Sequence, residues 1–412
     1  MSKGLDKIKE RGFLYQSTNI EGIEKLLSKD SSVFYLGIDP TADSLHIGHF
    51  FALRMFRILQ EQGHKGILVI GGATALVGDP TGKADMRKML SKEDVKRNLE
   101  EVKELAKRFI DTTGENPAII LDNAEWINKY PYIDFLREIG VHFSINQMLS
   151  TEAYSKRLES GGLTYLEMGY MLMQAYDFVY LNKKYGCELQ IGGSDQWGNI
   201  VAGTMLKRKM DFANEEKTNE IFGLTCPLLM TKDGKKMGKT EQGTLWVARE
   251  KTTPYDFYQY FYNVSDNDVE TLLKFFTDMD IKDIEKMCKE DIILAKKEMA
   301  HSITKLVHGK DHADRAVEAS NKIFNSSFAK EGAPTLNIKN NEMENLGILD
   351  LMTMSGLSKS NSEARRLINQ GGITFNEERV KEISLDVAEI LRKKKSVLLK
   401  KGKKHIVQIN II

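Results

Sequence analysis

Short apolar runs bounded by turn residues recur in the first half of the chain. They stand at 33–38, 66–71 and 118–121, and such runs are typical of strands buried on both faces of a parallel sheet. The segment 94–109 carries apolar residues at three- and four-residue spacing, which predicts an amphipathic helix. Because strands and helices alternate, the pattern predicts an α/β domain that binds ligands at the carboxyl ends of its strands.

The pattern changes after residue 253. Segments 268–276 and 293–307 show helical spacing without strand signals, which predicts a small all-α domain. Near the end, Ser360 and Glu363 form a capping box that starts a helix, and the run 405–412 partly alternates as a strand does. We therefore expect a Rossmann-like catalytic domain at 1–225, a loop at 226–250, the helical domain at 251–328, a polar linker at 329–346 and an α+β domain at 347–412.

Composition narrows the class of protein. The 412 residues are 41% hydrophobic and 28% charged with a net charge of +1, which excludes a disordered or fibrous chain. The three cysteines stand far apart, which argues against a disulfide scaffold or a thiolate zinc site and favours a reducing compartment. The N-terminus lacks an apolar signal core, and no apolar run is long enough to span a membrane. We therefore expect a cytoplasmic protein without a membrane partner.

The balanced net charge hides a basic C-terminal part. Residues 347–412 hold 13 Lys and Arg against 7 Asp and Glu, which indicates a polyanionic partner. The ordinary alternative is a solvated charged face, but here an apolar strand at 397–399 separates the charges and predicts a fixed patch. The candidate residues for binding this polyanion are Arg365, Arg366, Arg392, Lys393, Lys394, Lys400 and Lys401.

Two segments carry candidate phosphate chemistry. His46 and His49 lie at the start of an apolar helical run after the first strand, where unpaired N–H groups and positive potential suit phosphate. The alternatives are a metal pair or surface histidines. Lys236, Lys239 and Thr240 stand in a polar loop, where ammonium groups could neutralise a leaving pyrophosphate; the alternative is a solvated basic loop.

The stretch 78–83 superficially suggests a P-loop. Val77 stands where its first glycine is needed and Ala84 replaces the magnesium-binding hydroxyl, so we reject that interpretation. Lys83 and Arg87 nevertheless remain candidates for phosphate contacts.

An apolar helix over 170–181 carries a polar stripe. At about 100° per residue, Gln174 and Asp177 each fall within about 40° of Tyr170 on the helix surface. A carboxylate on a buried helix needs a partner, so the stripe predicts a polar pocket. The alternative is that Asp177 satisfies a neighbouring helix.

These segments together resemble those of a known family. The His46–His49 and Lys236–Thr240 segments resemble the two ATP-binding signatures of class I aminoacyl-tRNA synthetases, although Gly238 and Thr240 stand where serines are commoner. The segments 170–177 and 192–199 resemble those of bacterial-type tyrosyl-tRNA synthetases, and the basic C-terminal part is similar to their S4 RNA-binding domain. The resemblance implies activation of L-tyrosine by ATP to tyrosyl-adenylate and transfer of tyrosine to tRNA(Tyr).

The resemblance also implies roles for individual residues. The tyrosine site would comprise Tyr35, Asp79, Tyr170, Gln174, Asp177 and Gln196. The ATP site would comprise Gly37, Asp39, His46, Gly48, His49, Gly192, Asp195 and Lys239. The residues that assist phosphoryl chemistry would be Thr41, His46, His49, Lys83, Arg87, Lys236, Lys239 and Thr240. Mg²⁺ would arrive on ATP without a protein-bound metal, the loop at 226–250 would be mobile, the helical domain would bind tRNA, and the protein would be a homodimer.

Three other interpretations compete with this one. A tryptophanyl-tRNA synthetase shares the fold, but Asp177 with Tyr35 and the basic tail favour tyrosine. A nucleotidyltransferase with a histidine motif leaves the helical domain and the tail unexplained. A non-catalytic RNA-binding protein is disfavoured by the intact signature residues.

Overall fold

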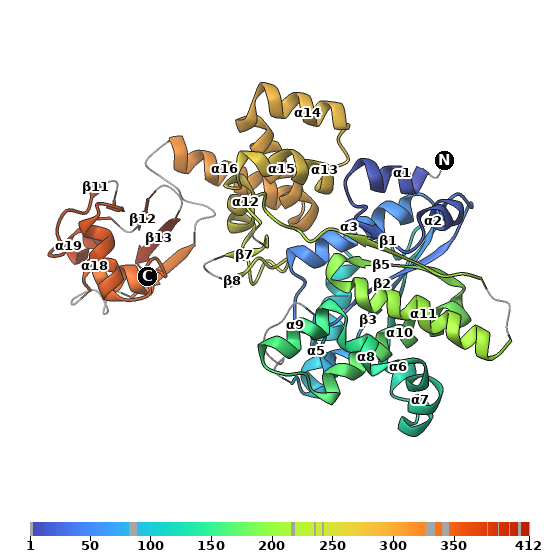
Figure 1. Ribbon diagram of the computed structural model, residues 1–412. Coiled ribbons are helices and arrows are strands. Elements are labelled where there is room, and N and C mark those ends of the chain that lie inside the picture. The colour runs from blue at the N-terminus through green and yellow to red at the C-terminus, as the bar shows by residue number, and fades with distance from the viewer. Residues whose placement is uncertain are drawn as a thin grey trace. The chain divides into compact units, whose positions relative to one another are not determined.

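The computed structural model describes residues 3–81, 89–215, 219–234, 236–240, 243–325, 334–339, 346–376, 378–385, 387–394, 396–402 and 405–411 (Figure 1). The chain divides into two compact units, one of residues 1–252 and 261–307 and one of residues 253–260 and 308–412. In the described part of the chain, every helix is too short or too polar to cross a bilayer.

A six-stranded sheet forms the centre of the first unit. Its strands are β1 (Gln16–Ser17), β6 (Phe222–Cys226), β5 (Cys187–Gly193), β2 (Val33–Ile38), β3 (Lys65–Ile70) and β4 (Ile119–Asp122), in that spatial order. Only β1 runs antiparallel to its neighbour. The predicted α/β class is therefore confirmed, and the three predicted strands match β2, β3 and β4 to within one residue.

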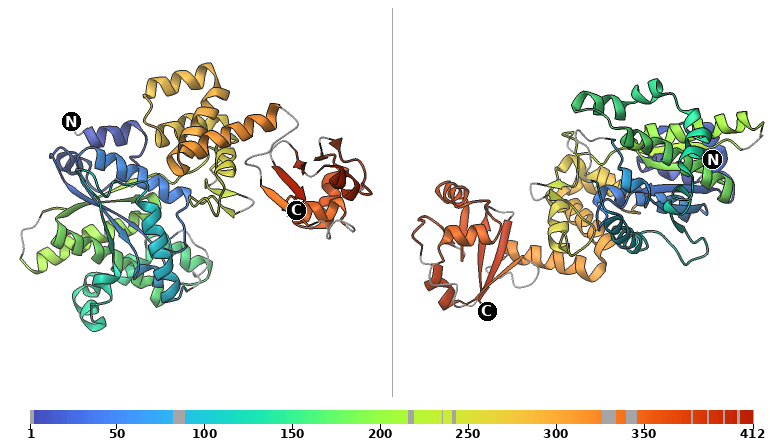
Figure 2. Two further views of the ribbon diagram at one scale, coloured as in Figure 1. Left: turned by 180° about the vertical axis from the view of Figure 1, so that it is seen from behind. Right: turned by 90° about the horizontal axis from the view of Figure 1, so that it is seen from below.

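Neighbouring residues on β2 show which helices cover each face of the sheet. Phe34 packs edge-on against Phe56 of α3 (Ile47–Glu61), whereas Tyr35 packs edge-on against Phe178 of α10 (Tyr165–Tyr185). Because successive strand residues point to opposite faces, α3 and α10 cover opposite sides of the sheet (Figures 1 and 2). Helix α11 (Trp197–Ala213) packs beside α10.

The described part of the first unit contains further helices, some of which pack against the sheet or against α3. Those before β5 are α1 (Lys3–Glu10), α2 (Ile20–Leu27), α4 (Thr74–Val77), α5 (Lys92–Ala106), α6 (Ala124–Ile127), α7 (Tyr132–Glu138), α8 (Ile145–Leu149) and α9 (Glu152–Ser160). Short 3-10 turns lie at η1 (Gly140–His142), between α7 and α8, and at η2 (Ser194–Gln196), directly after β5. Later come the small hairpin of β7 (Lys239–Thr240) and β8 (Gly243–Thr244), then α13 (Asp266–Phe276), α14 (Ile281–Glu290) and α15 (Ile292–His308), whose last residue belongs to the second unit.

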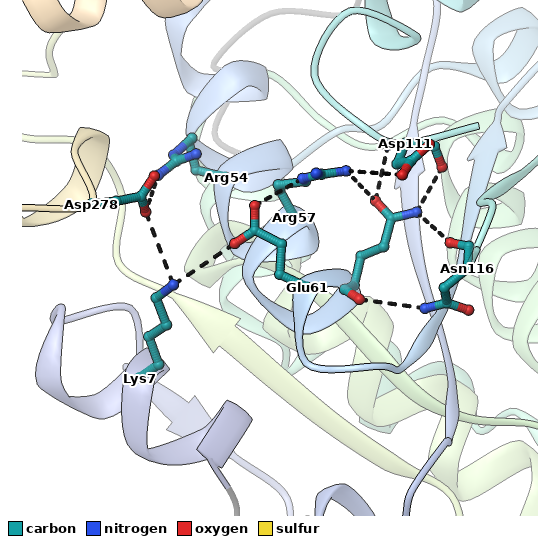
Figure 3. A network of polar contacts seen from close by, with 8 residues as sticks. Lys7, Arg54, Arg57, Glu61, Asp111, Asn116 and Asp278 are labelled. Carbon is teal, nitrogen blue, oxygen red and sulfur yellow. Dashed lines mark hydrogen bonds and ion pairs between the residues drawn. The ribbon is translucent and has the colours of Figure 1, made fainter. Parts of the chain in front are cut away.

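A polar network fixes the C-terminal end of α3 (Figure 3). Gln60 is 4% exposed, and its amide donates to the carbonyls of Asp111 and Asn116 at 2.7 and 2.9 Å while accepting from the Asp111 N–H at 3.0 Å. Ion pairs join Arg54 to Asp278 at 3.2 Å and Lys7 to Glu61 at 3.7 Å. Helix α3 is thereby held to α1, to the loop after α5 and to the loop after α13.

The second unit holds a separate five-stranded sheet. Its strands are β11 (Glu378–Arg379), β10 (Ile373–Phe375), β12 (Ser396–Lys401), β13 (His405–Ile411) and β9 (Thr335–Ile338), in that order. The helices are α12 (Pro254–Tyr262), shared with the first unit, α16 (Lys310–Asn325), α17 (Ile348–Met354), α18 (Asn361–Asn369) and α19 (Val387–Lys393). Alternate residues of β12 and β13, including Val397 and Ile409, enter a buried apolar core.

The polar stretch that the sequence suggests as a linker contributes a strand. Residues Thr335–Ile338 form β9, which pairs in parallel with β13, and Ile338 is buried in the core. The strand holds only two apolar side chains, Leu336 and Ile338, among polar residues, so it gave no clear strand signal. Its pairing partner β13 lies some seventy residues later in the sequence. The sheet of the second unit therefore begins before residue 347.

Candidate active site

A cavity of about 440 Å³ opens at the carboxyl ends of the parallel strands. Its lining comes from the residues that follow β2, β3, β5 and β6, from the start of α3 and from one face of α10. This is where the alternation of strands and helices predicts a ligand. Of the candidate residues, it is lined by Tyr35, Gly37, Asp39, Thr41, His46, Gly48, His49, Asp79, Tyr170, Gln174, Asp177, Gly192, Asp195, Gln196 and Lys236.

Four candidate residues are not placed in the cavity. Lys83 and Arg87 lie outside the residues that the structure describes. The backbone of Lys239 and Thr240 forms β7, and only their backbone is described.

A buried carboxylate closes one end of the cavity. Asp177 on α10 is 4% exposed, and its oxygens accept from Trp126 Nε1 at 2.7 Å and from Asn123 Nδ2 at 3.0 Å. The pKa of Asp177 is raised to about 7, chiefly by burial and in part by the nearby carboxylates of Asp39 and Asp122, whereas the two hydrogen bonds that it accepts oppose the rise. Asp177 therefore does both things that the sequence suggests, since it accepts from Trp126 on a neighbouring helix and also lines the cavity.

A chain of hydrogen bonds continues from this carboxylate across the cavity floor. Asn123 Nδ2 also donates to Thr74 Oγ1 at 3.1 Å, and Thr74 donates to Asp39 Oδ1 at 2.7 Å. The other oxygen of Asp39 accepts from the Tyr170 hydroxyl at 2.9 Å. Gly71 allows Asp39 and Thr74 to approach each other beside the backbone, since a Cβ at residue 71 would lie 2.0 Å from Asp39 Oδ1 and 2.2 Å from Thr74 Oγ1. The two polar ends of the α10 stripe therefore belong to one network.

Three buried polar atoms near this network have no hydrogen-bond partner among the described residues. They are the hydroxyl of Tyr35, Oε1 of Gln174 and Oε1 of Gln190, and all three residues line the cavity. Burial, with a smaller contribution from Asp177, raises the pKa of Tyr35 well above its usual value, so its phenol stays protonated. A buried polar atom without a partner costs about 1–3 kcal/mol, which a polar ligand in the cavity would recover.

A second pair of polar side chains lies on another wall. Asp79 is 6% exposed, and it accepts from the Thr81 N–H at 2.9 Å and from Gln196 Nε2 at 2.8 Å. Gln196 in turn accepts from Asn199 Nδ2 at 3.2 Å. Both side chains are thereby held in fixed orientations where they line the cavity.

The two histidines stack at the N-terminus of α3. Their ring centroids lie 3.6 Å apart with planes inclined by 13°. His46 caps the helix, because its Nδ1 accepts from the N–H groups of Gly48 and His49 at 3.1 and 3.2 Å, and Nδ1 of His49 accepts from the His46 N–H at 3.4 Å. A backbone N–H can only donate, so each neutral imidazole carries its proton on Nε2. The Nε2–H groups are therefore the donors that these side chains can offer to a ligand.

Residues of the second half of the sheet complete the cavity. Burial raises the pKa of Asp195, which the positive charge of Lys236 partly opposes. Lys236 itself is exposed and lines the mouth, while Met237 beside it is buried. The residues that the structure describes contain no cluster of three or more His, Cys, Asp or Glu side chains suited to a metal ion.

Sequence reasoning missed several residues of this site. Thr74, Asn123, Trp126 and Gln190 contact or line the cavity network, yet each stands alone in its segment without a motif. Only the tertiary structure brings them to Asp177. The mostly polar sequence around Trp126 gave no sign that its indole N–H would be buried and donate to a carboxylate.

The basic candidates lie on the second unit. Arg365 and Arg366 on α18 and Arg392 on α19 are exposed. Lys394 donates to Asn376 Oδ1 at 3.1 Å, and Lys401 on β12 lies 3.6 Å from Glu363. Lys400 precedes Lys401 on the same strand and is half-buried, and the side chain of Lys393 is not among those described.

Comparison with known proteins agrees with this geometry. Residues 27–325 match the family described as tRNA synthetases class I (W and Y), and residues 325–409 match the tyrosine–tRNA ligase SYY-like C-terminal domain. The chain therefore belongs to the class I tRNA synthetases of the W and Y group.

Its relatives and structural neighbours are more specific. A tyrosine–tRNA ligase of Clostridium tetani is 46% identical over 409 residues, 98% of each chain, and one of Acetivibrio thermocellus is 43% identical over 416 residues, the full length of both. A C-terminally truncated mitochondrial tyrosyl-tRNA synthetase of Aspergillus nidulans superposes with a TM-score of 0.70 at 28% identity, covering 79% of this chain and 95% of that one. A tryptophanyl-tRNA synthetase of Encephalitozoon cuniculi, with a TM-score of 0.56 at 15% identity over 75% of this chain and 87% of that one, shares the fold alone.

The raised pKa of Asp177 predicts a pH-dependent stability. Between about pH 4 and pH 7 the folded protein holds a proton that the unfolded chain releases, so the free energy of unfolding falls as the pH rises. A pKa raised from 3.8 to about 7 corresponds to about 4 kcal/mol in total. Urea unfolding from pH 5 to pH 8 should show this fall in the wild type, and Asp177→Asn should remove it. Parallel pH profiles for the two proteins would contradict the assignment.

Proposed function

We propose that this chain is a tyrosine–tRNA ligase. It activates L-tyrosine with ATP to tyrosyl-adenylate and pyrophosphate, and then transfers tyrosine to the terminal ribose of tRNA(Tyr). The observation that carries the proposal is that Asp177 and Tyr35 line the same cavity as the stacked histidines of α3. The relatives named tyrosine–tRNA ligase, at 43% to 46% identity over essentially the whole chain, support it.

The polar end of the cavity suits tyrosine. In our proposal the substrate phenol donates to Asp177 and accepts from Tyr35, whose hydroxyl then gains a partner. The ammonium group lies among Tyr170, Gln174 and Asp79, and Gln196 lies near the substrate carboxylate. A phenylalanine ligand would leave the phenol-binding groups underpaired, which weakens its binding. Asp39 holds Tyr170 in place by the hydrogen bond at 2.9 Å.

The opposite end suits ATP. Asp195 would accept from the ribose hydroxyls, and the glycines Gly37, Gly48 and Gly192 let the nucleotide approach the backbone. His49 would orient the nucleotide. We assign stabilisation of the β- and γ-phosphates to Thr41, His46, Lys83, Arg87, Lys236, Lys239 and Thr240.

The chemistry requires no enzyme nucleophile. The tyrosine carboxylate attacks the α-phosphorus of ATP, the new O–P bond forms, and the bond to pyrophosphate breaks. Negative charge grows on the leaving group, so the donors at the start of α3 and the lysine side chains act by charge stabilisation and positioning. Mg²⁺ arrives on the nucleotide as part of the substrate. Since the cysteines Cys187 and Cys226 are buried and Cys288 is half-buried, without a disulfide, we place the reaction in the cytoplasm.

Amino-acid-dependent exchange of pyrophosphate into ATP tests this function. Tyrosine should support exchange, whereas phenylalanine and tryptophan should not. Tyr35→Phe should weaken tyrosine binding about 2- to 10-fold, the equivalent of one neutral hydrogen bond, and should leave phenylalanine binding unchanged. Tyr176→Phe is the matched control, because Tyr176 lies on the same helix as the stripe but does not line the cavity. Exchange driven by tryptophan instead of tyrosine would overturn the proposal.

We also propose a homodimer through an apolar surface of the first unit. Exposed apolar side chains gather between residues 132 and 166, including Ile133 at 61% exposed and Tyr165 at 70%, and the hydroxyls of Tyr132 and Tyr165 lie 3.0 Å apart. Exposed apolar patches of this kind mark association surfaces, and self-association pairs the same surface of two copies.

Sedimentation equilibrium tests the dimer. Ile133→Asp should raise the dimer dissociation constant by at least about 10-fold, because a carboxylate would be buried at the interface. Ile293→Asp is a matched control, since Ile293 is exposed to the same degree, 60%, but lies on α15. An unchanged dissociation constant for Ile133→Asp would place the interface elsewhere.

The second unit supplies a proposed RNA-binding surface. Arg365, Arg366 and Arg392 are exposed on α18 and α19, and the arginine side chain pairs well with phosphate. Because these arginines would neutralise phosphates of the tRNA backbone and release counterions, the binding would weaken as the salt concentration rises.

Replacing these three arginines by glutamine should weaken tRNA binding. The slope of log affinity against log salt should fall by up to about three, one for each lost phosphate contact. Tyrosine-dependent pyrophosphate exchange should stay at the wild-type rate, because the cavity belongs to the other unit. A wild-type salt dependence would show that these arginines do not contact the tRNA backbone.

A further inference from the structure

The two signature segments of the first unit are joined by backbone hydrogen bonds. The Ile47 N–H donates to the Leu245 carbonyl at 3.2 Å, and the Val247 N–H donates to the Leu45 carbonyl at 2.9 Å. A β-bridge also pairs His46 with Trp246. The chain that follows the lysine motif therefore runs along the N-terminus of α3, where the stacked histidines lie.

A single glycine determines how closely the lysine motif itself approaches this helix. The Leu245 N–H donates to the Gly238 carbonyl at 2.7 Å. Gly238 has a φ of +82°, and a Cβ built on it would lie 2.4 Å from Cγ2 of Ile47. Real side chains do not come this close, so any residue with a Cβ must displace either the motif or the first turn of α3.

The contact lies between two groups that line the cavity. Ile47 follows His46 and is 2% exposed, and Lys236 stands two residues before Gly238. Met237 between them is buried, and its N–H donates to the Leu229 carbonyl at 2.8 Å. A displacement at Gly238 therefore changes the separation between Lys236 and the imidazoles of His46 and His49.

We propose that the packing of Gly238 on Ile47 is a positioning contact that sets the lysine motif against the histidine motif. This inference rests on the proposed function, because its effect is on adenylate formation. A side chain at residue 238 moves the ammonium group of Lys236 relative to the transferred phosphates. Tyrosine binding at the Asp177 end of the cavity stays unchanged, since the atoms nearest to a Cβ at Gly238 belong to Ile47 and Leu245, which are not part of that network. Misplacement by about 1 Å costs about 100-fold in rate.

Three substitutions separate the contact from its alternatives. Gly238→Ala introduces the Cβ, and Gly234→Ala is its matched control, because Gly234 in the same segment also has a positive φ, +76°, but open space around its Cβ position. Ile47→Leu removes the Cγ2 atom that would be struck while keeping the side-chain volume. Ile47→Val keeps Cγ2 and serves as the control for that change.

The measurements are single-turnover adenylate formation and equilibrium tyrosine binding in the full-length protein. Gly238→Ala should slow adenylate formation 10- to 100-fold with tyrosine affinity within twofold of the wild type, and Gly234→Ala should slow it less than threefold. Adding Ile47→Leu to Gly238→Ala should restore at least fivefold of the lost rate, whereas adding Ile47→Val should restore none.

The possible failures are distinct. If the wild-type protein forms no adenylate with tyrosine, the proposed function falls. If the wild type is active but Gly238→Ala behaves as Gly234→Ala does, or Ile47→Leu and Ile47→Val rescue equally, the positioning contact is overturned. A loss of tyrosine affinity in Gly238→Ala that matches its loss of rate would also overturn it, because the effect would then not be confined to the phosphate end.

Discussion

The buried carboxylate of Asp177 is the constraint on which the site depends. A charge that is 4% exposed on an otherwise apolar helix needs fixed partners, and they come from a different part of the chain. Asn123 and Trp126 reach it from the turn and short helix after β4. Strand β4 lies beside β3 at the sheet edge, and α10 packs on the face of the sheet that carries Tyr35, so the residues after β4 can reach Asp177. The position of β4 in the sheet therefore supplies the hydrogen-bond donors that allow a carboxylate to be buried in this cavity.

The same carboxylate fixes the distance between two polar side chains that line the cavity, those of Asp177 and Tyr170. From Asp177 the hydrogen bonds run through Asn123 and Thr74 to Asp39, and from Asp39 to Tyr170. Each of these hydrogen bonds is 3.1 Å or shorter, so Asp177 and Tyr170 are held by one network. Hydrogen bonds in a low dielectric reinforce one another, so this network makes the cavity rigid before a ligand enters.

The sequence predicted the elements better than it predicted the site's supporting residues. Strands β2, β3 and β4 and the helices at 266–276 and 292–308 follow from local periodicity, which needs no partner. The stripe of α10 was also local, because Tyr170 and Asp177 lie on one helix. Asn123 and Trp126 could not be predicted, since their roles arise only when β4 and α10 meet. Strand β9 was missed for the same reason, because its partner β13 lies at the far end of the unit.

The departure of the lysine segment from its commoner form has a physical reason in this fold. A serine at residue 238 would have to adopt a φ of +82° and place a Cβ against Ile47, and both are unfavourable for an L-residue. The residue at 238 and the residue that begins α3 are therefore not independent. A chain that carries a side chain at 238 must hold its lysine segment farther from the histidines or carry at 47 a residue without the Cγ2 branch of isoleucine. The two signature segments are best interpreted as a matched pair whose separation is set by packing.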